Sequence, residues 1–124
     1  MSRTILIADD EPNIVISLEY LMKREGYAVS VARNGEEALA AIRRDGPELV
    51  LLDVMMPKKS GFEVCQEVRA DDALKDTLIL MLTAKGRDTD IAKGLGCGAD
   101  AYMTKPFSTR ELVQKVREML EPRA

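Results

Sequence analysis

The chain has 124 residues, 46% hydrophobic and 31% charged, which suits one soluble domain that is large enough to fold around its own core. Its 21 acidic and 18 basic residues give a net charge of −3, whereas a surface for nucleic acid would need an excess of basic residues. Histidine is absent, which excludes the usual general base and the commonest zinc ligand.

Short aliphatic segments alternate with segments of helical periodicity along the chain. In chain order, the predicted elements are a strand at Thr4–Ala8, a helix from Pro12 to Gly26, a strand at 27–32, a helix from Asn34 to Gly46, a strand at 48–52, a helix after Gly61, a strand at 78–82, a helix at 88–95, a strand at 101–104 and a helix from Ser108. Most of these strands are apolar at consecutive positions, as is typical of strands covered on both faces. The segment 27–32 alternates instead, which favours a place nearer the edge of the sheet.

Local signals mark the starts of several helices. Asn34 is followed three residues later by Glu37, and Ser108 by Glu111, both of which are patterns for an N-terminal cap. The helical pattern at 88–95 is weakened by Gly94 and by Gly96, which lies directly after it.

This alternation predicts the fold class. Strands that alternate with helices are parallel and joined by right-handed crossovers, so we expect an open α/β sheet with helices on both faces. About five strands and five helices would form one domain over residues 1–124. In such folds the functional site lies beyond the carboxyl ends of the strands.

Polar side chains follow four of the predicted strands at this edge. Asp9 and Asp10 come after the first strand, and Asp53 after the third. Thr83 and Lys105 follow the fourth and fifth. Each residue alone could be a helix cap or a solvated side chain. Because all five follow strands that end at the same edge, together they predict a site.

The residue types indicate the chemistry of this site. Two carboxylates about 4 Å apart repel by about 4 kcal/mol at an effective dielectric constant of about 20, so three of them need a cation or raised pKa values. An all-oxygen ligand set favours a hard divalent ion, and Mg²⁺ fits a few carboxylates with water and phosphate oxygens. A lysine and a hydroxyl beside it could hold the oxygens of a phosphoryl group.

No glycine-rich phosphate loop follows the first strand, where the sequence reads Ala8-Asp9-Asp10-Glu11-Pro12. A nucleotide is therefore not expected. We expect the phosphoryl group to come from another donor and to be accepted by a carboxylate nucleophile.

Several motifs match one known family. They are Asp9-Asp10, Leu51-Leu52-Asp53-Val54-Met55-Met56-Pro57, Ser60-Gly61, Leu82-Thr83-Ala84 and Gly98-Ala99-Asp100-Ala101-Tyr102-Met103-Thr104-Lys105-Pro106-Phe107. Over essentially its whole length the chain resembles the receiver domain of bacterial two-component response regulators. The resemblance implies a flavodoxin-like three-layer α/β sandwich with a five-stranded parallel sheet in the order 2-1-3-4-5.

The resemblance also implies a role for each residue at the strand ends. Asp53 would be the nucleophile that accepts a phosphoryl group. Asp10, Asp53 and the backbone carbonyl of Met55 would coordinate Mg²⁺, and Asp9 would act through a metal-bound water. Lys105 would pair with the phosphoryl oxygens. The chain would then be a signalling switch, whose only reactions are self-phosphorylation from phosphodonors and slow autodephosphorylation, rather than an enzyme.

The switch implied by the resemblance uses Thr83 and Tyr102. On phosphorylation the Thr83 hydroxyl would move to a phosphoryl oxygen and the Tyr102 ring would turn inward. The face formed by helix 88–95, strand 101–104 and the last helix would report the change. The bond between Lys105 and Pro106 would be the cis peptide typical of the family. For Tyr102 the simpler alternative is a half-buried ring with a solvated hydroxyl.

The resemblance implies partners of two kinds. A sensor histidine kinase or phosphotransfer protein would donate the phosphoryl group, and an output domain or downstream protein would bind the reporting face. A phosphorylation-dependent homodimer is a further alternative, which Ala101 weakens because that position is often acidic in members that dimerise. We expect this domain to contact neither nucleic acid nor membrane. The sequence leaves open whether the receiver stands alone or belongs to a longer regulator.

The cysteines and apolar runs indicate a compartment. Cys65 and Cys97 are too far apart for a C-x-x-C motif, so we expect two buried thiols in a reducing cytosol. Every apolar run is much shorter than the ~20 residues that cross a bilayer. The apolar start of the chain is interrupted by acids at residues 9–11, too early for a secretory signal. We therefore expect a cytoplasmic protein.

Three other functions compete with a phosphoacceptor. A phosphatase of the haloacid dehalogenase type also uses an aspartate nucleophile with Mg²⁺, but needs an acid two residues later, where this chain has Met55. A flavin-binding module would need a phosphate loop and more than the 4% aromatic residues found here. A degenerate receiver acting only by protein contacts is disfavoured, because all five site residues are present.

Overall fold

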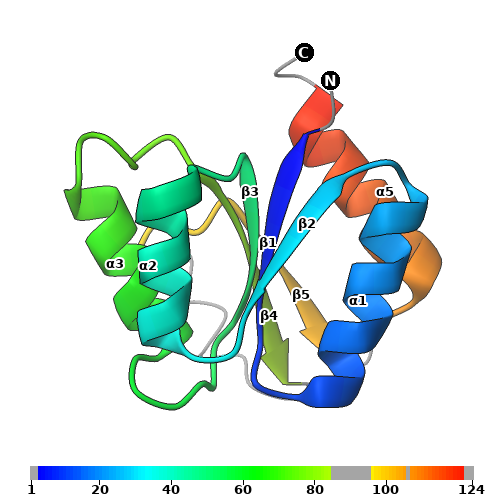
Figure 1. Ribbon diagram of the computed structural model, residues 1–124, viewed down its shortest axis with the longest axis horizontal. Helices are drawn as coiled ribbons and strands as arrows, with labels where there is room; N and C mark the ends of the chain where they lie inside the picture. The colour runs from blue at the N-terminus through cyan, green and yellow to red at the C-terminus, as the bar shows by residue number, and fades with distance from the viewer. Residues whose placement is uncertain (1–2, 85–95, 106, 122–124) are drawn as a thin grey trace.

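Five parallel strands form one sheet in the computed structural model, which describes residues 3–84, 96–105 and 107–121 (Figure 1). In chain order the elements are β1 (Thr4–Ala8), α1 (Pro12–Arg24), β2 (Ala28–Ala32), α2 (Gly35–Asp45), β3 (Leu49–Asp53), α3 (Gly61–Ala70), β4 (Leu78–Ala84), β5 (Ala101–Lys105) and α5 (Thr109–Leu120). The strands pair in the order β2-β1-β3-β4-β5. This order confirms the predicted parallel α/β sheet, with the alternating strand β2 at one edge.

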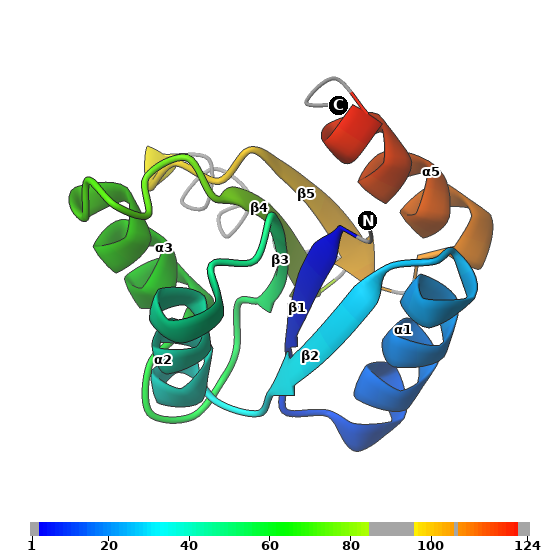
Figure 2. The ribbon, with the colours of Figure 1, turned by 45° about the horizontal axis from the view of Figure 1, so that its top comes forward.

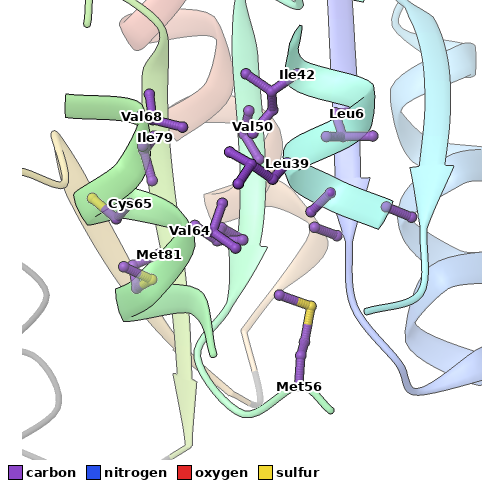
Figure 3. Packing of buried hydrophobic residues seen from close by; sticks show 14 of the residues in the cluster. Leu6, Leu39, Ile42, Val50, Met56, Val64, Cys65, Val68, Ile79 and Met81 are labelled. Atoms are coloured by element: carbon purple, nitrogen blue, oxygen red, sulfur yellow. The ribbon is translucent and has the colours of Figure 1, made fainter. Parts of the chain in front are cut away.

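Helices cover both faces of the sheet. α1 and α5 lie on one face, and α2 and α3 lie on the other (Figure 2). Successive side chains of a strand point to opposite faces, so Ile5 and Ile7 pack toward α1 and α5 while Leu6 and Ala8 pack toward α2 and α3. Figure 3 shows part of the apolar cluster on the α2 and α3 face, in which side chains of these helices meet those of β1, β3 and β4. The two apolar layers hold the ends of the central strands in fixed positions.

Three strands run further than the sequence predicts, and the added residues include the polar ones. β3 ends at Asp53 rather than at residue 52, β4 at Ala84 rather than 82, and β5 at Lys105 rather than 104. Asp53 is still paired with Leu82, and the ladder between β4 and β5 continues to the last residue of each. Backbone hydrogen bonds define a strand, so it continues where the apolar run stops. Consequently Asp53, Thr83 and Lys105 belong to the sheet itself rather than to loops.

The helix starts agree with the predicted caps. The Asn34 side chain accepts a hydrogen bond from the backbone N–H of Glu37 at 2.9 Å, and the Ser108 hydroxyl accepts one from that of Glu111 at 3.0 Å. The predicted helix at 88–95 lies outside the described residues, so the described part contains four helices rather than five. None of these four is long and apolar enough to cross a membrane.

One helix begins earlier than the sequence predicts. α3 starts at Gly61 rather than after it, because Ser60 caps the helix. The Ser60 hydroxyl accepts from the N–H of Glu63 at 3.2 Å, and the Glu63 carboxylate accepts from the N–H of Ser60 at 3.1 Å. This capping box fixes where the chain turns from the β3–α3 loop into the helix.

Candidate functional site

The carboxyl ends of β1, β3, β4 and β5 bring the predicted site residues to one edge of the sheet. Asp9 follows β1 directly, and its N–H donates to the carbonyl of Ala32 in β2 at 3.1 Å. Asp53 and Lys105 are the last residues of β3 and β5, and Thr83 is the last but one of β4. Four strands therefore position these side chains through their own backbone pairing.

Lys105 joins two acidic strand ends. Its ammonium Nζ lies 3.0 Å from Asp9 Oδ2 and 3.2 Å from Asp53 Oδ1. The Asp9 side chain is fully buried, and that of Asp53 is 9% exposed. The second oxygen of Asp9 accepts from the N–H of Glu11 at 2.9 Å. Both oxygens of Asp9 are therefore held by groups of the chain itself.

The acidic residues fit a hard divalent cation. Asp9, Asp10 and Asp53 each offer a carboxylate oxygen, and these three oxygens lie within 4.8 Å of one another. Asp10 is exposed, so the group is reached from solvent although Asp9 is not. Mg²⁺ is bound by carboxylates together with waters rather than by a closed protein cage, and this half-open all-oxygen group has that character.

The single ammonium does not balance the carboxylates around it. Burial, and then the charge of Asp9, raise the pKa of Asp53 from its ordinary value of 3.8 to about 6. Lys105 and the backbone N–H of Met55 act in the opposite direction but are outweighed. Burial lowers the pKa of Lys105, yet its hydrogen bond to Asp9 and the charges of Asp53 and Asp9 raise it overall. Lys105 therefore stays protonated, but its single positive charge does not offset the negative charges of the carboxylates around it.

A pH dependence of stability follows from the raised pKa of Asp53. Below pH 3.8 the Asp53 carboxyl is protonated in both the folded and unfolded states, and above about pH 6 it is ionised in both. Ionisation is less favourable in the folded state, so the folded state is destabilised relative to the unfolded state as the carboxyl loses its proton. We expect its contribution to the free energy of unfolding to fall by about 3 kcal/mol as pH rises from 3.8 to about 6 without divalent ions.

Urea unfolding of the wild type and of Asp53→Asn at several pH values, with a chelator present, measures this contribution as the difference between the two proteins. Because every other group titrates in both proteins, the difference isolates Asp53. A difference that stays constant across this pH range would contradict the raised pKa.

The hydroxyl of Thr83 has no hydrogen-bond partner within the described part of the chain. Thr83 is 1% exposed, and its Oγ1 is the one buried side-chain oxygen or nitrogen of the described residues that is left without a partner. A buried hydroxyl without a partner costs about 1–3 kcal/mol, so its presence at this edge calls for an explanation. An acceptor oxygen bound beside Asp53 would supply the missing hydrogen bond.

The remaining predicted residues are placed as follows. Met55 has an exposed side chain, and its backbone N–H donates to the Asp53 carboxylate. Tyr102 is 42% exposed, at the second position of β5. Pro106 lies outside the described residues, and with it the predicted cis peptide.

Sequence reasoning missed Gly61 as a support of the site. A side chain here would run into the carbonyl oxygen of Asp53, and its Cβ would lie 3.0 Å from the Cα of Val54. The N–H of Gly61 donates to the carbonyl of Val54 at 2.9 Å. The loop after β3 therefore folds tightly back under Asp53, and the cap formed by Ser60 and Glu63 was the signal that could have located this turn.

We expect Gly61→Ala to lower the free energy of unfolding by about 1–3 kcal/mol, because the added methyl group overpacks rigid backbone. Gly96→Ala is the matched control, since a Cβ there would meet nothing within 4 Å. Urea unfolding of both variants tests the difference. Equal free energies of unfolding for the two variants would show that the loop after β3 can move to accommodate the methyl group, and that it does not hold Asp53 rigidly.

Comparisons with known proteins agree on one family. A family model for the response regulator receiver domain matches residues 5–117. The alkaline phosphatase synthesis transcriptional regulatory protein PhoP of Bacillus subtilis is 48% identical over 120 residues, a match that covers 97% of this chain and 49% of PhoP. The chain thus spans about half the length of this curated relative.

Two solved structures give the same picture. A Chloroflexus aurantiacus protein assigned as a response regulator is 38% identical, with a TM-score of 0.93 and coverage of 97% of this chain and 98% of that one. The receiver domain of a Pseudomonas aeruginosa sensor histidine kinase is 26% identical, with a TM-score of 0.89 and coverage of 97% and 98%. That structure contains a magnesium ion coordinated in the active site cleft.

Proposed function

The chain belongs to the response regulator receiver domain family, and from this premise we propose that it accepts a phosphoryl group on Asp53 from a phosphohistidine of a sensor histidine kinase or phosphotransfer protein. The observation that carries the proposal is the Lys105 ammonium 3.0 Å from Asp9 and 3.2 Å from Asp53, beside the acidic group Asp9, Asp10 and Asp53. Residues 1–124 would act as one receiver domain.

The nucleophile is the Asp53 carboxylate. An oxygen of Asp53 forms a bond to phosphorus while the bond between phosphorus and the donor's histidine nitrogen breaks, and the donor leaves with that electron pair. The carboxylate must be ionised to attack, which a raised pKa opposes. Lys105 stays protonated and already contacts Asp53, so its ammonium is placed to hold a phosphoryl oxygen.

The acidic group would hold Mg²⁺ through Asp10, Asp53 and the carbonyl of Met55, with Asp9 acting through a water. Mg²⁺ supplies positive charge that offsets the carboxylates and the transferring phosphoryl oxygens. Asp9 fits an indirect role because both of its oxygens accept hydrogen bonds from Glu11 and Lys105. Asp10 fits direct coordination because it is the exposed member of the group.

Thr83 and Tyr102 would convert the new phosphoryl group into a change of surface. An aspartyl phosphate adds acceptor oxygens beside a buried hydroxyl that has no partner among the described residues, so Thr83 would move to donate to one of them. Tyr102 would turn inward behind it. Tyr102, Phe107, Glu111 and Lys115 line a shallow groove between β5 and α5, where an output domain or downstream protein would bind. Helix 88–95, the third part of the predicted face, lies outside the described residues.

A phosphatase of the haloacid dehalogenase type is disfavoured by position 55. The acid that would protonate a leaving group two residues after Asp53 is replaced by Met55, whose exposed thioether has no proton to give. We accordingly propose a cytoplasmic signalling switch rather than a hydrolase.

The test uses a small acyl phosphate as donor. With Mg²⁺ present, the intact chain should gain the mass of one phosphoryl group, and a chelator should prevent the gain. A phosphatase would instead turn over phosphate monoesters without a lasting gain in mass. A gain in mass that is equally large with chelator would contradict a metal-assisted acceptor.

A further inference from the structure

The two cysteines lie against each other although 31 positions separate them in the sequence. Cys65, on α3, is fully buried, and Cys97, in the segment before β5, is partly exposed. The Cys65 thiol donates to the carbonyl oxygen of Cys97 at 3.5 Å. Cys65 belongs to the apolar cluster under α2 and α3, and Cys97 packs against the same cluster (Figure 3 shows Cys65 there). Their side chains are also joined by a hydrogen bond.

Contacts that do not involve sulfur hold the Cys97 segment on α3. Arg69 lies one helical turn after Cys65 on the same face of α3. Its guanidinium donates to the carbonyl of Gly98 at 2.8 Å and to Asp100 Oδ2 at 2.7 Å. Asp100 Oδ2 also accepts from the N–H of Ile79 at 2.8 Å. The residues that directly follow Cys97 are therefore fixed to α3 and β4 independently of the thiols.

Gly98 supplies the turn that brings this segment close. Its φ is +103°, in the region that favours glycine, and a Cβ there would lie 2.9 Å from the Cγ of Arg69. The backbone after Cys97 can approach α3 only because position 98 carries no side chain. The turn at Gly98 and its contact with Arg69 therefore hold Cys97 beside Cys65.

A metal does not account for the pair. Structural zinc sites need four ligands, and the group Asp9, Asp10 and Asp53 is the one set of three or more metal-ligating residues found within the described ranges. Burial, and then the neighbouring Cys97, raise the pKa of the Cys65 thiol to about 12, so Cys65 is unreactive as a first nucleophile. Cys97 is the more accessible of the two and would meet an oxidant first.

We propose that Cys65 and Cys97 form a reversible oxidation site, in which a peroxide converts the two thiols into an intramolecular disulfide that joins α3 to the segment before β5. The site does not depend on phosphoryl transfer. Cytosolic disulfides are usually transient and redox-sensing, so thiol reductants would reverse it.

The chemistry balances in two steps. The Cys97 sulfur attacks one peroxide oxygen, the O–O bond breaks, and the products are a sulfenic acid on Cys97 and one water. The Cys65 sulfur then attacks the Cys97 sulfur, the S–O bond breaks, and the leaving hydroxide takes the Cys65 proton to form a second water. Two thiols lose two electrons in total, and one hydrogen peroxide molecule is reduced to two waters.

The test treats the chain with hydrogen peroxide, removes the excess with catalase, alkylates remaining thiols and analyses the unreduced digest by mass spectrometry. We expect a linked peptide that contains Cys65 and Cys97, with the loss of two hydrogen masses and of both alkylation sites. Dithiothreitol should restore both thiols.

Two single variants serve as matched controls. Cys65→Ser keeps a donor for the Cys97 carbonyl, and in it Cys97 should accumulate as a sulfenic acid that reacts with dimedone. In Cys97→Ser, Cys65 should resist peroxide and stay reduced, and this variant decides the order of oxidation if Cys65→Ser does not fold.

Three results would overturn the proposal. Both thiols could remain alkylatable after peroxide, the linkage could join two molecules rather than one, or Cys97 could be oxidised to the sulfinic acid without any linked peptide. A non-reducing gel distinguishes a linkage between molecules from one within the chain.

Discussion

Asp53→Asn should reduce phosphoryl acceptance to the level of a control without donor, because the amide replaces the nucleophilic carboxylate while keeping its shape. The variant should not lose stability at neutral pH. Burial and the charge of Asp9 raise the pKa of Asp53 to about 6, so removing its charge relieves an unfavourable interaction. The gain in mass from an acyl phosphate with Mg²⁺ measures acceptance, and thermal unfolding measures stability.

Asp45→Asn is the matched control. Asp45 ends α2 and is paired on the surface with Arg44 at 2.9 Å, so its loss should leave phosphoryl acceptance unchanged. Stable labelling of Asp53→Asn, at a rate near that of Asp45→Asn, would show that another group is the acceptor.

Lys105→Met should have the second largest effect. Lys105 is the cation that contacts both Asp9 and Asp53, and removing it leaves the fully buried Asp9 carboxylate without a counter-charge from the described residues. We expect the free energy of unfolding to fall by about 1–3 kcal/mol without divalent ions. We expect the rate of phosphoryl acceptance to fall by about 100-fold, which is the size of effect seen when one donor to a reacting oxygen is removed.

Added Mg²⁺ distinguishes the contribution of Lys105 to the stability of the fold from its contribution to the rate of phosphoryl acceptance. Extra positive charge should restore part of the stability but not the rate, because the ammonium that holds the phosphoryl oxygen is still missing. Lys23→Met is the control, since Lys23 pairs with Glu19 on the exposed side of α1 and should cost less than about 0.5 kcal/mol. A Lys105→Met protein that accepts the phosphoryl group at the wild-type rate would remove Lys105 from the mechanism.

The sequence was sufficient for the fold because the strands are short, aliphatic and separated by clear helical segments. Segments such as Thr4–Ala8 and Leu49–Asp53 are buried on both faces, and this leaves little ambiguity about a parallel sheet. The same reasoning located the acids and the lysine, since the carboxyl ends of parallel strands meet at one edge. The predicted ends of β3, β4 and β5 were one or two residues too early, because the backbone pairing of these strands continues past the end of the apolar run.

Distances and burial could not be read from the sequence. Nothing in the local pattern says that Lys105 is shared between Asp9 and Asp53, or that the Thr83 hydroxyl is buried without a partner in the described residues. These properties come from side-chain packing between strands that are far apart along the chain. The same packing buries Asp53 beside Asp9, and this burial and charge raise the pKa of Asp53.

The contact between Cys65 and Cys97 has the same origin. Spacing excluded a C-x-x-C motif, but spacing says nothing about residues that a turn at Gly98 and the guanidinium of Arg69 bring together. The prediction of two buried thiols is confirmed for Cys65 but is wrong for Cys97, which is partly exposed.

Locating the phosphoryl group on the chain identifies the acceptor residue directly. After reaction with an acyl phosphate and Mg²⁺, borohydride reduces an aspartyl phosphate to homoserine, which peptide mass spectrometry assigns to one position. Because Asp53 is the proposed acceptor, we expect homoserine at position 53 and at no other aspartate. Homoserine at position 9 or 10, or a phosphoryl group that survives on a hydroxyl such as that of Thr83, would contradict it.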